Sequence, residues 1–202
     1  EIEKKVVKQK SSQSAKVVEY DQSKLFFKFL EEDCTNYPSK IPELAFSVLT
    51  WFCGIRVEEA TRVNWSSIDK NAESIGKNEQ KDFSGWTVTV FADDEKSNVT
   101  KINPIPDNAK KWLEFCETKW PEDKLTWIAH PNWEKRKKKL WNKFKTKYDG
   151  ARPLPQNAGR HTWASHHYAL YGDKALTSFR LGHAEDSSTL FAYYRAVVKS
   201  AA

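Results

Sequence analysis

Residues 41–54 read Ile-Pro-Glu-Leu-Ala-Phe-Ser-Val-Leu-Thr-Trp-Phe-Cys-Gly, and this stretch decides the fold class. Its apolar side chains recur at spacings of three and four, which is the period of a helix. Pro42 suits the first turn of that helix, and Gly54 suits the position just beyond its end. The stretch therefore predicts a buried helix that other helices must cover.

Helical periodicity continues on both sides of this stretch. Before it, the pattern from Asp21 places Leu25, Phe26, Phe29 and Leu30 on one apolar face. The other expected helices follow it, at residues 56–63, 108–120, 132–148, 157–171, 173–181 and 187–198.

One part of the chain has the pattern of a small sheet instead. Residues 86–91 are β-branched and alternating, and a polar turn joins them to a second strand at 100–103. Pro104 and Pro106 indicate that the second strand ends early or lies at an edge. With a short strand at 67–69, the sequence predicts an α+β fold, mostly α, with a three-stranded antiparallel sheet.

Length and composition fit one folded domain with an arm. The chain has 202 residues, of which 39% are hydrophobic and 30% charged, and no run of apolar residues could span a membrane. Residues 1–20, rich in Lys, Ser and Gln, are expected to be a linker before a domain at 21–202. Cys34, Cys53 and Cys116 lie far apart and match neither a disulfide framework nor a zinc site, which favours reduced thiols in the cytoplasm.

The formal net charge of +6 favours a polyanionic partner. Much of the positive charge falls on one side of the expected helix at 132–148. The candidate DNA-backbone contacts there are Lys135, Arg136, Lys137, Lys138, Lys139 and Lys143. A solvated charged face is the plainer interpretation of such a run, and it stays open from the residues alone.

Four short stretches carry side chains suited to phosphate chemistry. Arg56 follows Gly54 and lies one helical turn from Glu59, a spacing at which a carboxylate can hold an arginine. Arg160 and His161 are adjacent in the first turn of a helix, where anions are favoured. The sequences Leu181-Gly-His183 and Tyr193-Tyr-Arg195 complete the set. Taken singly, each fits a surface ion pair, a helix cap or core packing.

The order and spacing of these stretches resemble the catalytic domain of the tyrosine recombinases, the phage-integrase type of site-specific DNA recombinases. The likeness covers roughly residues 20–200. It implies the catalytic residues Arg56, Lys96, Arg160, His183 and Tyr194, with Glu59 as the acidic companion of the first arginine.

Two of these assignments keep an alternative. Lys96 lies in the expected hairpin turn, but Lys101 is a possible substitute, and otherwise a DNA contact, because the turn length is not fixed by sequence. Tyr194 is preferred to Tyr193 as the nucleophile because members of the family commonly have Arg directly after it, as Arg195 is here.

One position departs from the family pattern. The family usually has His three residues before the second arginine, and this chain has Asn157. Asparagine can hydrogen-bond a phosphate oxygen but cannot carry a proton at neutral pH. His161 is the nearest group by sequence that could take the proton, although the family normally uses that position structurally.

The resemblance implies cleavage and rejoining of double-stranded DNA through a 3′-phosphotyrosyl intermediate, without a cofactor or metal. It also implies a tetramer on DNA, a cytoplasmic DNA-associated location, and an N-terminal DNA-clamping domain preceding Glu1. A type IB topoisomerase-like enzyme and a DNA-binding module that no longer cleaves are the alternatives.

Overall fold

The computed structural model describes residues 17–72, 85–92, 100–120, 132–149, 151 and 154–182. The helices are α1 (Tyr20–Asn36), α2 (Ile41–Phe52), α3 (Val57–Ala60), α4 (Asp107–Lys119), α5 (Trp133–Lys147), α6 (Ala158–Tyr171) and α7 (Lys174–Leu181). The strands are β1 (Ile68–Ala72), β2 (Gly85–Val90) and β3 (Lys101–Pro104). The predicted α+β class, mostly helical with a small sheet, is confirmed.

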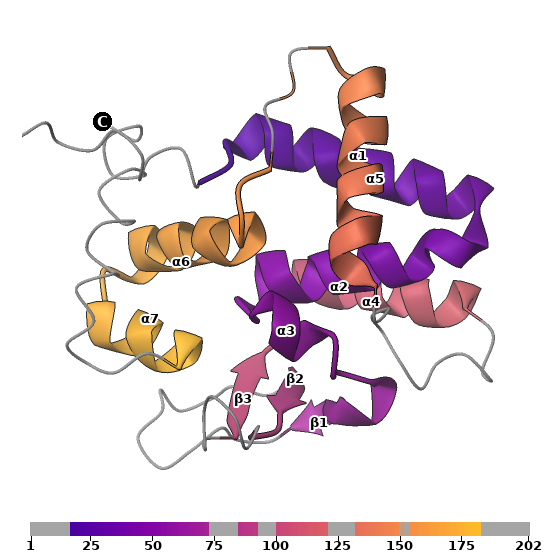
Figure 1. Cartoon of the computed structure of the whole chain (residues 1–202). Helices are drawn as coiled ribbons and strands as arrows, with labels where there is room; N and C mark the ends of the chain where they lie inside the picture. Colours follow the sequence, from indigo (N-terminus) through magenta and orange to yellow (C-terminus); the bar gives the residue numbers. More distant parts are fainter. Residues whose placement is uncertain are drawn as a thin grey trace, which may run out of the picture.

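Helix α2 is the centre of the domain. Residues Ile41 to Trp51 are all buried, and α1, α4, α5 and α6 contact this helix (Figure 1). A helix that is apolar around most of its circumference must be covered on all sides. The charged exception is Glu43, which accepts two hydrogen bonds of 2.8 Å from the Arg136 guanidinium on α5.

Aromatic side chains fill the space between α1, α2 and α5. The ring of Phe26 lies 5.7 Å from that of Trp51, 5.6 Å from Trp141 and 5.4 Å from Phe144, distances typical of aromatic pairs in cores. Leu25, expected on the buried face of α1, is 41% exposed, and Phe27 is buried instead. The buried face of α1 is therefore displaced from the predicted one, because α2 and α5 cover the helix from two directions.

The sheet is antiparallel in the order β1-β2-β3. Val88 of the central strand pairs with Ile68 on one side and Asn103 on the other. Strand β3 ends at Pro104 and lies at an edge, as the prolines predict, and the turn expected after β2 lies outside the described residues. The Asn103 side chain donates a 2.9 Å hydrogen bond to the Cys53 carbonyl, which ties the sheet to the end of α2.

The third helix is shorter than predicted. Helix α3 has four residues, and the chain then turns into the 3-10 segment Trp65–Ser67, where the Asn64 side chain accepts a hydrogen bond from the Ser67 backbone N–H. Val63 lies beyond the end of α3 but is buried in the core. An apolar residue at this position is therefore explained by burial and does not require the helix to extend to residue 63. The helix expected at 187–198 and most of the proposed arm at 1–20 lie outside the described residues.

The three cysteines are buried and unpaired, and burial raises the pKa of the Cys34 and Cys53 thiols to about 12. They are therefore protonated core residues rather than reactive thiolates. Within the described part of the chain, no helix is both long enough and apolar enough to cross a membrane.

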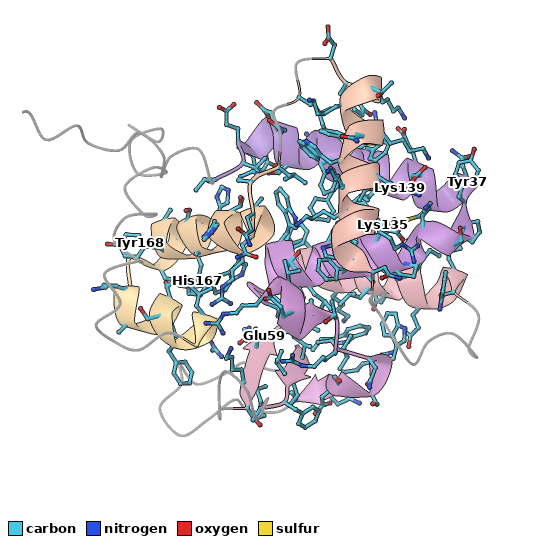
Figure 2. The ribbon with its side chains drawn as sticks, in the orientation of Figure 1. Tyr37, Glu59, Lys135, Lys139, His167 and Tyr168 are labelled. Atoms are coloured by element: carbon cyan, nitrogen blue, oxygen red, sulfur yellow. The ribbon has the colours of Figure 1, made fainter. Side chains whose placement is uncertain are left out.

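A histidine joins α6 to α7. His167 lies on the side of α6 that faces α7 (Figure 2). Its ring is 4.6 Å from that of Trp163 and 4.6 Å from that of Tyr171, and its Nδ1 is 2.8 Å from Thr177 Oγ1. The Thr177 hydroxyl donates to the Asp173 carbonyl, so its oxygen is left to accept from an Nδ1–H. Burial, aided by the charge of Arg180, lowers the pKa of His167 to about 4.

We expect this histidine to make the domain less stable in mild acid. The unfolded chain takes up a proton near pH 6.5 and the folded chain only near pH 4, so stability falls as pH drops between these values. For a half-buried group the loss should be about 1–2 kcal/mol. In urea denaturation at pH 7 and pH 4.5, His167→Gln should lose less stability than the unmutated chain, and equal losses would contradict the assignment.

Candidate active site

Arg56 and Glu59 form a local pair at the start of α3. The Arg56 backbone N–H and its Nη1 donate to the Glu59 carboxylate at 3.1 and 2.7 Å. Gly54 makes this geometry possible because it adopts φ +66°, and the Trp163 ring occupies the space that a Cβ would need. The Arg56 side chain remains 34% exposed, so it can also reach a ligand.

Lys101 binds the same carboxylate from the sheet. It is the first residue of β3, its Nζ pairs with Glu59 Oε1, and both side chains are only 7% exposed. Burial raises the pKa of the Glu59 carboxyl, but the bonds from Lys101 and Arg56 outweigh this and hold the pKa at about 2. Glu59 is therefore a buried anion shared by two cations.

Arg160 joins the ends of two helices. Its Nη1 donates to the Gly54 carbonyl at 2.6 Å and its Nη2 to the Leu181 carbonyl at 2.5 Å. The residue lies in the first turn of α6, next to Gly159, where a Cβ would meet the Trp51 ring. A lysine could not make both bonds in this planar arrangement.

The turn after α7 lies against Lys101. Gly182 has φ +62°, and a Cβ at this position would lie 2.3 Å from Lys101 Cε. The Leu181-Gly182 sequence therefore packs on the cluster formed by Arg56, Glu59, Lys101 and Arg160. These four residues form the cationic cluster.

The cationic cluster has three positive side chains and one negative. Figure 2 shows Glu59 where α3, α6, α7 and the sheet approach one another. Burial lowers the pKa of the Lys101 ammonium, the bond to Glu59 partly offsets this, and the charges of Arg56 and Arg160 lower it further. A surplus of positive charge with fixed guanidiniums suits the binding of a phosphate.

The structure thus brings Arg160 together with Arg56 and Glu59, although Arg160 lies far from these two in sequence, and adds Lys101. The remaining expected site residues Lys96, His183, Tyr193 and Tyr194 lie outside the described residues. Among the described residues, no group of three or more His, Cys, Asp or Glu side chains could hold a metal ion.

The two supporting residues expected beside Arg160 lie at the start of α6. Asn157 precedes the helix in a left-handed conformation, φ 56°, and its side chain makes no capping hydrogen bond. It lines a small cavity together with Arg160 and Lys137. His161 is half-buried in the next position of the helix.

Three basic residues of α5 form ion pairs with acidic residues of α1 and α2. Arg136 pairs with Glu43, Lys143 lies 2.5 Å from Asp33, and Lys147 pairs with Glu32. Arg136 and Lys143, two of the expected DNA contacts, thus pair with acidic residues 93 and 110 positions away in sequence. The exposed lysines of the helix are Lys135, Lys138, Lys139, Lys143, Lys145 and Lys147.

The fold of this chain is similar to those of several solved structures. No family model and no curated protein sequence matches the chain. The crystal structure of XerA recombinase matches 91% of this chain and 63% of its own, with a TM-score of 0.62 and 16% identity. XerH site-specific recombinase, bound to difH substrate in a pre-cleavage complex, matches 92% of this chain and 52% of its own at TM-score 0.63 and 14% identity.

A third solved structure has a similar fold. The Tn1549 transposon integrase in complex with circular intermediate DNA matches 93% of this chain and 67% of its own, with a TM-score of 0.64 and 12% identity. The chain therefore has a tyrosine recombinase fold. The resemblance that its motifs predict is confirmed for the fold. It spans about half to two thirds of the length of these proteins.

We expect Glu59→Gln to destabilise the domain by about 3 kcal/mol, because it leaves Lys101 buried beside two arginines without a counter-charge. Urea denaturation at pH 7 measures the change. Glu58→Gln is the matched control, since Glu58 is the exposed neighbour on the same helix. Equal stability of the two variants would show that the carboxylate does not hold the cluster together.

Proposed function

We propose that this protein cleaves and rejoins DNA strands in site-specific recombination or integration, through a 3′-phosphotyrosyl intermediate. The observation that carries the proposal is the junction of Arg56, Lys101 and Arg160 around Glu59, in a fold shared with DNA recombinases. Such a junction has the charge and the rigidity needed to bind one phosphodiester.

The arginines have the role of stabilising the transition state. Attack on a phosphodiester places negative charge on the non-bridging oxygens, and fixed guanidiniums stabilise that charge without reorganising. Arg160 is held by two carbonyls and Arg56 by Glu59, so each is positioned before DNA arrives. His183 and Asn157 are proposed to hydrogen-bond the same phosphate.

The strand is exchanged without loss of bond energy. The phenolic proton of Tyr194 passes to a base, for which His161 is the nearest candidate by sequence, and the Tyr194 oxygen forms an O–P bond while the bond to the 5′ oxygen breaks. The leaving oxygen takes a proton from a lysine, for which Lys96 is the proposed donor and Lys101 the alternative. The phosphotyrosyl ester conserves the energy of the phosphodiester, so rejoining is the reverse step and needs no cofactor.

Duplex DNA is the proposed partner, with the protein associated with DNA in the cytoplasm and assembled there as a tetramer. The solved structures of XerH and the Tn1549 integrase are DNA complexes, which supports DNA as the partner. The exposed face of α5 that includes Lys135, Lys138 and Lys139 is proposed to lie along the phosphate backbone (Figure 2).

A second candidate is a DNA-binding module that retains the fold but no longer cleaves. The specific observation in its favour is Asn157, which stands at the start of α6 where the family usually has a histidine. The two candidates differ in one product, the covalent protein–DNA adduct.

We expect Tyr194→Phe to abolish the covalent adduct while leaving folding and non-covalent DNA binding intact, because only the phenolic oxygen is lost. The measurement is a denaturation-resistant band after incubation with a nicked DNA that carries the target site. Tyr193→Phe is the matched control and should keep the band, since adjacent helical positions point about 100° apart. Loss of the band with Tyr193→Phe alone would make Tyr193 the nucleophile, and a band that survives loss of both would refute the mechanism.

The proposed DNA face predicts a salt effect. Replacing Lys135, Lys138 and Lys139 together with Gln should reduce the slope of log K against log salt by about 2–3, since each phosphate contact contributes about 0.9. The measurement is duplex DNA binding by fluorescence anisotropy at several salt concentrations. Replacing Lys110, Lys111 and Lys119 of α4 removes the same charge and should change the slope much less, and equal changes would place DNA elsewhere.

A further inference from the structure

The acidic end of α1 borders the basic helix α5. The two helices cross (Figure 1), and the ring of Phe144 on α5 lies 5.4 Å from that of Phe26 and 5.6 Å from that of Phe29 on α1. Beside this contact, α1 carries three consecutive carboxylates at residues 31–33. Two lysines of α5, one helical turn apart, pair with members of this run, and their partners differ in burial.

Lys143 is paired with a buried carboxylate. Its Nζ lies 2.5 Å from Asp33 Oδ1, and the Asp33 side chain is only 6% exposed. The second oxygen, Asp33 Oδ2, is also buried and has no hydrogen-bond partner among the described residues. The Lys143 ammonium is held further by the Tyr37 ring, 4.9 Å away. If Lys143 turned to a DNA phosphate, the Asp33 anion would stay buried without this counter-charge, which is strongly unfavourable.

Lys147 is paired with an exposed carboxylate instead. The Glu32 side chain is 39% exposed and that of Lys147 46%. The rings of Tyr148 and Phe29 lie 5.7 and 5.9 Å from the Lys147 Nζ. An ion pair between exposed side chains contributes little to stability, because water solvates both ions when they separate. Lys147 can therefore exchange Glu32 for a phosphate, and the released carboxylate remains in water.

We propose that Glu32 occupies the place of a DNA phosphate on Lys147 in the free protein and that duplex DNA displaces it, whereas Asp33 keeps Lys143 away from DNA in both states. The proposal rests on the proposed function and deepens it. Lys147 thereby joins the exposed lysines at the start of α5 as a contact to the DNA backbone. Lys143, which is as exposed as Lys147, is instead a structural cation between α1 and α5.

The first test compares the two lysines, each of which is the control for the other. Lys147→Gln should reduce the slope of log K against log salt for duplex DNA by about 0.9, the contribution of one phosphate contact, and leave the urea midpoint unchanged. Lys143→Gln should leave the slope unchanged and lower the urea midpoint by about 1 M, because it strands Asp33. Equal losses of slope, or loss with Lys143→Gln alone, would overturn the proposal.

A double variant covers the case in which Lys143→Gln does not fold. Asp33→Asn with Lys143→Gln replaces the ion pair by two neutral side chains of nearly the same size, so no buried charge is left without a partner. This variant should fold and bind duplex DNA with the slope of the unmutated chain. A slope reduced by about 0.9 would make Lys143 a DNA contact and would overturn the proposal.

The second test removes the competing carboxylate. Glu32→Gln should raise duplex affinity about two- to fivefold, the factor that corresponds to one exposed ion pair. Glu31→Gln is the matched control, because Glu31 is the exposed neighbour on α1 and has no ion pair within the described part of the chain. It removes the same charge and should raise affinity less. Adding Lys147→Gln to Glu32→Gln should abolish the gain; a gain that persists, or equal gains from both glutamate variants, would contradict the exchange.

Covalent adduct formation on nicked DNA is measured in parallel, so that this proposal and the proposed function fail separately. The expected slopes without any adduct would support the exchange at Lys147 and refute cleavage. An adduct without the expected slopes would support cleavage and refute the exchange. An unmutated chain that binds no duplex would overturn the exchange directly.

Discussion

The arrangement of the site depends on one buried carboxylate. Three cationic side chains repel one another at a junction shielded from water, and Glu59 is the counter-charge within it. By bonding Arg56 of the α3 turn and Lys101 of β3, it holds the sheet against the helical core. Arg160 bonds the Gly54 and Leu181 carbonyls, and the turn at Gly182 packs on Lys101, so segments of α3, β3, α6 and α7 meet around this ion pair.

The protein has two groups of positively charged side chains, the cationic cluster and the lysines of α5, and they differ in how firmly they are held. The cationic cluster is held by hydrogen bonds to carbonyls and a carboxylate, which suits charge that develops in a transition state. The lysines along α5 are mostly exposed; Lys147 pairs at the surface with Glu32 of α1, whereas Lys143 pairs with the buried Asp33. An exposed pair such as Lys147 with Glu32 contributes little to stability, so its loss to a phosphate would cost little.

Much of the fold could be predicted because its signals are local. The period of residues 41–54 gives α2, and the alternation before Phe91 with the later prolines gives β2 and the edge strand β3. The pair of Lys101 with Glu59 and that of Arg136 with Glu43 could not be predicted, because nothing local marks partners 42 and 93 residues apart. The motif order grouped Arg56, Glu59 and Arg160, and the structure places these three at one junction; their catalytic role stays a prediction.

The two bonds of Arg160 have a mechanical consequence. Its guanidinium bridges the Leu181 carbonyl at the end of α7 and the Gly54 carbonyl beyond α2, so it connects the end of the last described helix directly to the turn after α2. A pull on the chain beyond Gly182 is therefore transmitted to Arg160 and on to the turn that carries Arg56.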